Sequence, residues 1–271
     1  MKNLNPSWPV SPERMARGLY WHEAWKLVEG CTHVSAGCDR CWSAKETHAR
    51  AAHPNVKISV PKQGLVEGGH FNGKIRLRKD NLDKPLRRRK PTVYAIWNDL
   101  FHEDVPKSFI VATFSAAINS NIHKYLFLTK RPERLNEVIA IAGECGALPI
   151  PLPLHLWLGV SVEDQKTADE RIPLLLQTPA AKRFVSYEPA LGLVDFSAYL
   201  PQTVLPDQDD GTGYMTTGLN WIIMGGENGK GARPMNPDWA RKTRDDCKAA
   251  GVPFFFKNGV LDGVEHKEVL R

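Results

Sequence analysis

Three of the five cysteines lie close together, in the segment GCTHVSAGCDRCW at residues 30–42. Cys31, Cys38 and Cys41 have the spacing C-x6-C-x2-C, so the last two can bind one metal centre within a single turn while the longer loop brings in the first. Gly30 and Gly37 allow the backbone to fold tightly there. In a reducing compartment, clustered cysteines indicate a metal or redox site rather than disulfides.

The residues alone leave four interpretations of this cluster open. A structural zinc ion takes four protein ligands, and His33 or His48 could supply the fourth, although a second C-x2-C is absent. Cys38 and Cys41 could form a redox-active dithiol, and all three could be inert buried thiols. Three cysteines are best explained by a [4Fe–4S] cluster, which usually takes four thiolates and would here keep one iron open for a non-protein ligand.

Repeated strand and helix signals predict the scaffold that must position these groups. Apolar runs begin near residues 93, 125, 156, 183, 221 and 254, with an earlier candidate over 24–29. Helix signals fill the gaps over 107–117, 133–142, 164–175 and 237–250. Strands alternating with helices are typical of a parallel sheet. The number of repeats favours an α/β fold, a full or partial (β/α) TIM-type barrel with parallel strands, over an open doubly wound sheet.

Polar residues follow each predicted strand, where a (β/α) barrel places its active site. The candidates are Asn98, Asp99, Lys130, Ser161, Glu163, Glu188, Gly225, Gly226, Glu227 and Lys257. Some, such as Asp99 and Ser161, are also good helix caps. Glu and Lys directly after a buried strand are less easily explained as caps, so a site at the carboxyl ends of the strands is predicted.

Charge places one basic segment within an otherwise near-neutral chain of 271 residues. The net charge is +6, yet residues 74–90 alone hold nine basic and two acidic side chains. Such clustering predicts a polyanion partner, with a solvated charged loop as the alternative. The candidates for nucleic-acid binding are Arg76, Arg78, Lys79, Arg87, Arg88, Arg89 and Lys90.

The patterns predict a single domain over residues 1–271, with the basic insertion at about 54–91 and a Pro-, Gly- and Asp-rich surface loop at about 201–219. The sequence contains no run of about 18 apolar residues, which a membrane-spanning helix would need. Residues 1–18 have no apolar segment of the kind found in signal peptides. We therefore expect a cytoplasmic protein. The sequence predicts no particular oligomeric state.

Seven stretches between about residues 21 and 259 resemble, in order, a family of phage and bacterial proteins of unassigned function with a three-cysteine motif. They are GCTHVSAGCDRCWSA, NDLFHEDVP, LFLTKRPERL, LWLGVSVEDQ, DERIPLLLQTPAAKRFVSYEPALG, WIIMGGENGKGARPMNPDW and AAGVPFFFKNG. The cysteines and the barrel also resemble those of radical S-adenosylmethionine (SAM) enzymes. The chain departs from their usual C-x3-C-x2-C spacing, and Asp39 stands where they have an aromatic residue.

The resemblance implies a [4Fe–4S] cluster whose open iron binds SAM, and a one-electron cleavage that gives a 5′-deoxyadenosyl radical. It also implies cofactor contacts, which are assigned to Trp42, Asn98, Asp99, Ser161, Glu163, Gly225, Gly226 and Glu227. Lys130, Glu188 and Lys257 are then the candidate catalytic residues for substrate binding or proton transfer.

We therefore expect a radical-SAM-like iron–sulfur enzyme that acts on nucleic acid, by base modification or lesion repair, and receives electrons from an external donor. The alternative is a zinc- or cluster-stabilised nucleic-acid-binding protein without radical chemistry. A third interpretation is an enzyme for a small phosphorylated substrate that uses Lys130 and Arg131. The basic insertion is expected to emerge near the mouth of the site, where a polyanion would approach.

Overall fold

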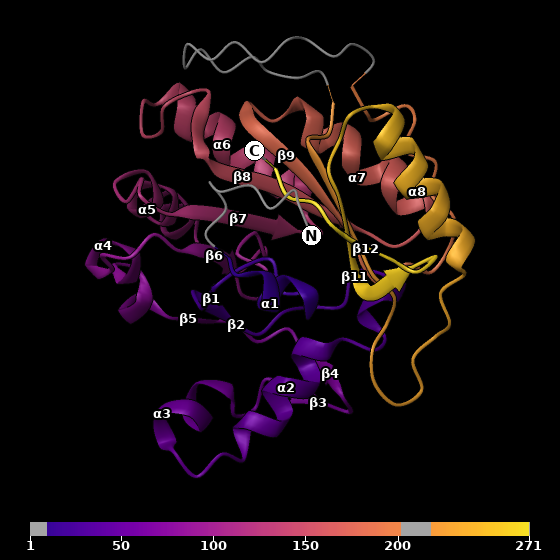
Figure 1. Cartoon of the computed structure of the whole chain (residues 1–271). Coiled ribbons are helices and arrows are strands. Elements are labelled where there is room, and N and C mark those ends of the chain that lie inside the picture. The colour runs from indigo at the N-terminus through magenta and orange to yellow at the C-terminus, as the bar shows by residue number, and fades with distance from the viewer. Residues whose placement is uncertain (1–9, 202–217, 271) are drawn as a thin grey trace.

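A largely parallel sheet forms the centre of the protein in a computed structural model that describes residues 10–201 and 218–270 (Figure 1). The order of its eight strands is β1-β6-β7-β8-β9-β10-β11-β12. Their bounds are β1 (Glu23–Trp25), β6 (Val93–Ile96), β7 (Lys124–Thr129), β8 (Leu152–Val162), β9 (Ala180–Tyr187), β10 (Trp221–Met224), β11 (Phe254–Leu261) and β12 (Val264–Lys267). Neighbouring strands are parallel from β1 to β11, and β12 pairs antiparallel with β11. The predicted α/β class is confirmed, with the sheet forming a partial (β/α) barrel.

Helices alternate with the strands and cover the outer face of the sheet, as the sequence predicts. They are α5 (Lys107–Ile118), α6 (Pro132–Glu144), α7 (Gln165–Gln177) and α8 (Pro237–Ala249), and a short α1 (Pro12–Ala16) precedes the sheet. Asp164 caps α7 by accepting a hydrogen bond from the backbone N–H of Thr167 at 2.9 Å, and Asn236 caps α8 in the same way. These caps fix where each helix begins relative to the preceding strand end.

Alternating side chains of the strands build two separate apolar layers. In β10, Ile222 and Met224 pack with the helices, whereas Trp221 and Ile223 belong to the layer on the inner face. The ring of Trp221 meets that of Trp157 edge-on, with 5.9 Å between centroids. Large aromatic side chains therefore fill the inside of the partial barrel.

The predicted strand over 24–29 is two strands in different sheets. β1 joins the main sheet, and β2 (Val28–Glu29) pairs antiparallel with β5 (Arg76–Leu77). Most of the predicted loop at 201–219 lies outside the described residues. No helix in the described part of the chain is long and apolar enough to cross a membrane.

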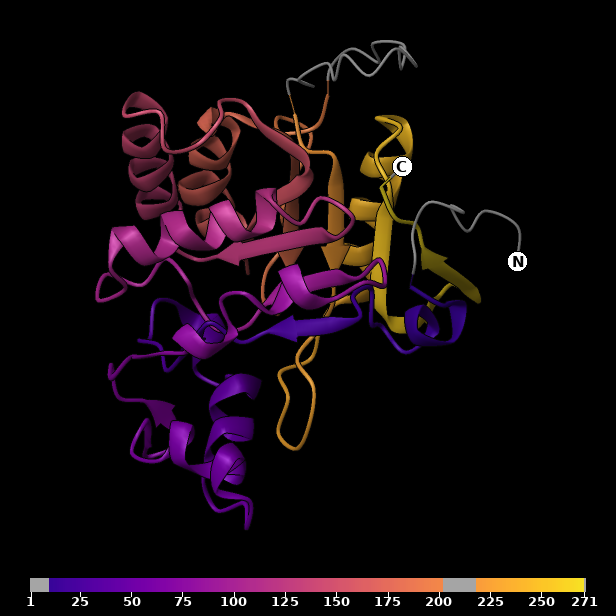
Figure 2. The same ribbon diagram turned by 90° about the vertical axis from the view of Figure 1, so that its left-hand side faces the viewer.

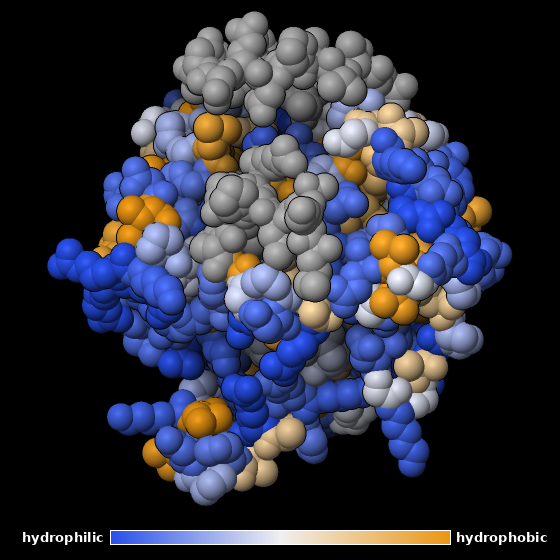
Figure 3. Space-filling view, in the orientation of Figure 1, coloured by the Kyte–Doolittle hydropathy of each residue, from blue (hydrophilic) through white to orange (hydrophobic). Residues whose placement is uncertain are grey.

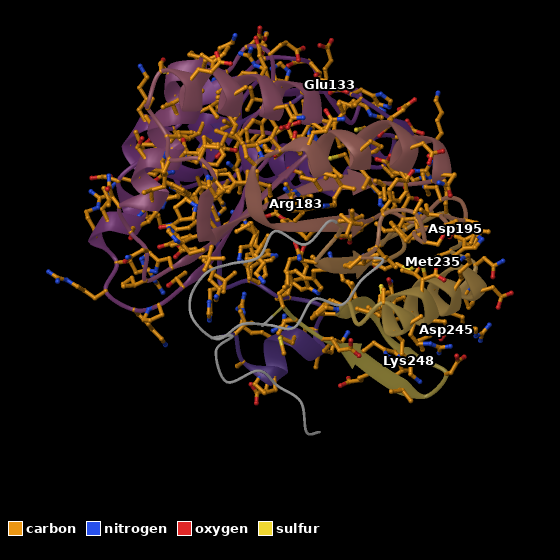
Figure 4. The ribbon with its side chains drawn as sticks, turned by 90° about the horizontal axis from the view of Figure 1, so that it is seen from above. Glu133, Arg183, Asp195, Met235, Asp245 and Lys248 are labelled. Atoms are coloured by element: carbon orange, nitrogen blue, oxygen red, sulfur yellow. The ribbon has the colours of Figure 1, made fainter. Side chains whose placement is uncertain are left out.

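Two features lie on the side towards which β9 and β10 run (Figure 2). One is a small lobe, hereafter the α2–β4 lobe, made of α2 (Trp42–Ala51), α3 (Val56–Ser59), η2 (Val60–Lys62), β3 (Val66–Glu67) and β4 (His70–Phe71). The other is the segment between β10 and α8, residues 225–236, hereafter the strap. Met235 near its end lies beside α8 (Figure 4). The lobe and the strap thus flank the carboxyl ends of the strands.

Candidate functional site

The three cysteines lie in the turn that joins β2 to α2. Cys38 ends the single-turn helix η1 (Ala36–Cys38), and Cys41 is the N-cap residue of α2. Gly30 has a φ of +99°, and a side chain at this position would overlap the carbonyl oxygen of Lys74. The backbone N–H of Gly73 donates to the carbonyl of Cys31 at 3.2 Å. The start of the cysteine loop is therefore pressed against the segment that leads into β5.

Two polar residues at the ends of β7 and β8 hold the middle of this loop. Ser35 donates its hydroxyl hydrogen to Glu163 Oε1 at 2.7 Å, and Lys130 Nζ lies 3.1 Å from Ser35 Oγ and is ion-paired with Glu163. A Cβ atom at Gly37 would lie 2.5 Å from Glu163 Oε1 and 2.8 Å from Lys130 Nζ. Glycine at position 37 thus lets the loop sit directly on the carboxyl ends of the strands.

Cations lie beside two of the three sulfur atoms. Lys130 Nζ is 3.6 Å from Cys38 Sγ. The positive charge of Arg131 acts on Cys31, where burial, together with the charge of Asp99, raises the thiol pKa to about 12 and Arg131 opposes the rise. Burial also raises the pKa of Cys41. Since a metal centre binds the thiolate form, these cations stabilise the form that burial disfavours.

The donor set suits an iron–sulfur cluster. All three cysteines are free and half-buried, and thiolates are the usual ligands of such clusters. Among residues 10–201 and 218–270, no three His, Cys, Asp or Glu side chains stand close enough to hold one metal ion. The thiolates of a cluster bind different irons and so lie farther apart than the ligands of a single ion. Of the histidines considered for zinc, His33 bonds Asp39 at 2.7 Å and His48 is exposed on α2.

The predicted strand-end residues on this side of the mouth are engaged with the protein itself. Asp99 accepts hydrogen bonds from Arg131 at 2.7 Å and from Thr129 at 2.8 Å. Asn98 has a φ of +57° and accepts from Ser43 at 2.6 Å. Both side chains therefore position the elements that carry the cysteines.

Glu163 is held in the same way. It is 1% exposed, and Arg171 of α7 donates to Glu163 Oε2 at 3.1 Å and to the carbonyl of Ser161 at 2.7 Å. With Lys130 and Ser35 on its other oxygen, the Glu163 carboxylate joins α7, β7 and the cysteine loop. Its place in the structure explains why a carboxylate directly follows the buried strand β8.

A second polar group lies at the ends of β9, β10 and β11. Lys257 Nζ lies 2.6 and 2.7 Å from the two carboxylate oxygens of Glu188, and both side chains are partly exposed. Asn258 Oδ1 accepts from the backbone N–H of Gly226 at 2.8 Å. A Cβ atom at Gly225 would lie 3.1 Å from Asn258 Oδ1, so glycine eases this approach. The predicted residues Glu188, Lys257, Gly225 and Gly226 are thus brought together.

A family model for proteins of unknown function, DUF5131, matches residues 18–267, which is most of the chain. The chain belongs to the DUF5131 family. No curated protein and no solved structure matches it. The extent of the match agrees with the resemblance predicted from about residue 21 to 259, and the matched range includes the cysteine loop and every strand-end candidate.

In this DUF5131 protein the strap ties the far side of the mouth to the cysteine loop. Arg233 donates to the carbonyl of Ala36 at 2.8 Å, contacts Asp39 at 3.4 Å and is ion-paired with the buried Glu227. Glu227, predicted as a cofactor contact, therefore orients Arg233. Sequence reasoning missed Ser35, Arg171 and Arg233, although all three lie in stretches that match the family.

The basic segment of the DUF5131 chain does not gather at the mouth as expected. It runs along β2 and β1 towards the amino end of the sheet: Arg78 lies beside Glu29 at 3.6 Å, whereas Arg88 lies beside Glu23, the first residue of β1, at 3.4 Å. Its helical turns are η3 (Lys79–Asn81) and α4 (Lys84–Arg87). Only its first part, with Lys74, adjoins the cysteine loop. Arg78, Lys84, Arg87 and Arg88 are in ion pairs.

The second half of the predicted insertion departs from the expected position because it follows the β1 edge of the sheet, whereas the first half belongs to the α2–β4 lobe beside the strand ends. Trp25 Nε1 donates to the carbonyl of Asn81 at 2.8 Å, and Asn81 Nδ2 donates to the carbonyl of Lys26 at 2.8 Å. These bonds cover the edge strand, which would otherwise present unpaired backbone groups. Figure 3 shows a continuous hydrophilic area over the α4 end of this segment.

Proposed function

We propose that this protein is a radical-SAM-like iron–sulfur enzyme in which Cys31, Cys38 and Cys41 hold a [4Fe–4S] cluster and nucleic acid is the substrate. One observation carries the proposal: the cysteine loop sits on the carboxyl ends of parallel strands, with cations at two of its sulfur atoms. In α/β folds this is the edge of the sheet at which substrates bind.

Lys130 and Arg131 offset the negative charge of the thiolates, and Glu163 and Asp99 hold the two cations in place. When bound, the cluster and SAM supply one-electron cleavage of a carbon–sulfur bond and abstraction of hydrogen from the substrate. An external electron donor is required. Arg233 of the strap fixes the loop from the opposite side.

Glu188 and Lys257 are the residues that act on the substrate. Their oxygen and nitrogen atoms are 2.6–2.7 Å apart, so Lys257 donates to the Glu188 carboxylate, and a substrate group that enters between them can bind to either side chain or exchange a proton with it. Both are partly exposed, which leaves them open to a substrate. Tyr20 lies beneath them, and burial together with the negative charge of Glu188 raises its pKa, so Tyr20 stays protonated.

Anaerobic reconstitution with iron and sulfide tests the proposal. We expect the wild-type chain to bind iron and sulfide and to produce 5′-deoxyadenosine from SAM under reducing conditions. Variants Cys31→Ser, Cys38→Ser and Cys41→Ser should lose both properties. Cys145→Ser and Cys247→Ser are the matched controls and should keep both, because these cysteines lie elsewhere in the fold.

Stoichiometric zinc with no cluster would overturn the proposal. An intact cluster that yields no 5′-deoxyadenosine would also contradict it. That second result would favour a cluster-stabilised nucleic-acid-binding protein without radical chemistry.

A further inference from the structure

One aromatic side chain lies exposed beside the cysteine loop. Among the Phe, Tyr and Trp residues of the described chain, residues 10–201 and 218–270, Trp42 alone is exposed, at 59%. It directly follows Cys41 and begins α2. A large exposed ring that follows a candidate cluster ligand is placed to contact whatever enters the mouth.

The ring of Trp42 is held in a fixed position. Its edge-on partner is the buried Trp97, with ring centroids 5.1 Å apart and an angle of 83° between the planes. The hydrogen bond from Ser43 to Asn98, 2.6 Å long, fastens this end of α2 to the segment that follows β6. A pre-positioned ring loses little conformational freedom when a ligand covers it.

The charges near Trp42 along the chain are mainly positive. Lys45 is exposed one turn later on α2, and Arg40, two residues before Trp42, is 43% exposed and lies 4.0 Å from Glu227. Lys26 lies over the ring of Trp97, 5.0 Å from its centroid. Of the acidic groups, Glu46 is already paired with Arg50 at 2.5 Å. An aromatic ring among cations is the arrangement that binds single-stranded nucleic acid, where bases stack and phosphates meet the cations.

We propose that Trp42 is a stacking platform for an unpaired base of single-stranded nucleic acid. The inference rests on the proposed function only in taking nucleic acid as the substrate. An unpaired base offers a free face to the ring, whereas bases within a duplex are covered by their neighbours. A protein partner fits less well, because it needs about 800 Å² on each side and α2 exposes no other large apolar side chain.

Fluorescence anisotropy with a labelled single-stranded oligonucleotide, and with the matching duplex, tests this site. Stacking on one aromatic residue contributes about 1–3 kcal/mol, which corresponds to about a 5- to 140-fold change in affinity. Trp42→Ala should weaken single-strand binding by that factor and leave duplex binding unchanged. Trp42→Phe should retain most of the affinity. Leu86→Ala is the control, since Leu86 is similarly exposed, at 50%, but lies on α4.

Equal single-strand affinity in Trp42→Ala and the wild type would overturn the inference. So would a loss confined to SAM binding, which would assign the ring to the cofactor. The two proposals fail separately. If the protein holds no cluster but Trp42→Ala still weakens oligonucleotide binding, only the proposed enzyme is refuted. If the protein cleaves SAM, and the wild type and Trp42→Ala bind the oligonucleotide equally, only the proposed stacking role of Trp42 is refuted.

Discussion

At the scale of single residues, the site depends on charges placed against sulfur. Lys130 contacts Cys38, Ser35 and Glu163 at once, so it holds both the cysteine that we propose as a cluster ligand and the loop that carries it. Its position directly after β7 made it a candidate in the sequence. Ser35 and Arg171 could not be found in that way, because they contact Glu163 from a loop and from a helix.

Replacing Lys130 by Met should weaken the hold on iron. A hydrogen bond to a charged group contributes about 1.5–3 kcal/mol, so the chelator concentration that removes half of the iron from the reconstituted protein should fall tenfold or more. Lys166→Met is the control, because Lys166 is 81% exposed on α7. Equal iron retention in the two variants would argue against a role of Lys130 at the thiolates.

At the scale of elements, the strands with continuous apolar runs could be predicted and the polar ones could not. β7 and β10 lie close to their predicted positions because they are covered on both faces. β12 has the sequence VEHK and was missed, since its side chains are mostly polar. β3, β4 and β5 have two residues each, too few for a periodic pattern.

Removing the contact between the strap and the cysteine loop should loosen the loop. Arg233→Ala removes the hydrogen bond to Ala36 and the contact with Asp39, so bound iron should be lost to a chelator several-fold faster. Arg244→Ala serves as the control, since Arg244 contacts Asp245 and Asp262 rather than the loop. An unchanged rate of iron loss in Arg233→Ala would show that the strap does not restrain the site.

The β11–β12 hairpin predicts a pH dependence of stability. Hydrogen bonds from Arg241 and Arg244 lower the pKa of Asp262 to about 2, from 3.8. A lowered pKa in the folded state stabilises the protein above pH 3.8, and this contribution is lost as the pH falls towards 2. Asp262→Asn, which suits the positive φ of this turn, should lower the Tm at pH 7 by about 1–2 °C. Thermal melts between pH 7 and pH 2.5 should show that difference shrink, and a constant difference would contradict the assignment.

At the scale of the whole molecule, the partial barrel brings chain segments far apart in sequence to one edge, and the total charge does not reveal which cations lie there. Lys74 and Arg76 are exposed near the cysteine loop, whereas Arg87 and Arg89 lie beyond η3, towards the amino end of the sheet. The sequence located the charge, but the course of the segment along β1 depends on tertiary hydrogen bonds.

This division of charge can be tested with matched double variants. The double variant Lys74→Gln with Arg76→Gln should reduce the magnitude of the slope of log affinity against log salt concentration by up to two. The slope changes by about one for each phosphate that the protein no longer neutralises. Arg87→Gln with Arg89→Gln removes the same charge at the other end and should leave the slope of log affinity against log salt nearly unchanged. Equal effects of the two pairs would show that nucleic acid follows the whole β1 edge.

The central claim is that three cysteines hold a cluster with one iron open to SAM. Electron paramagnetic resonance of the reduced, reconstituted protein, recorded with and without SAM, tests it most directly. We predict about four irons and four sulfides per chain and a cluster signal that changes when SAM is added. A signal that SAM leaves unaltered, or that persists in the Cys31→Ser, Cys38→Ser and Cys41→Ser variants, would contradict the claim.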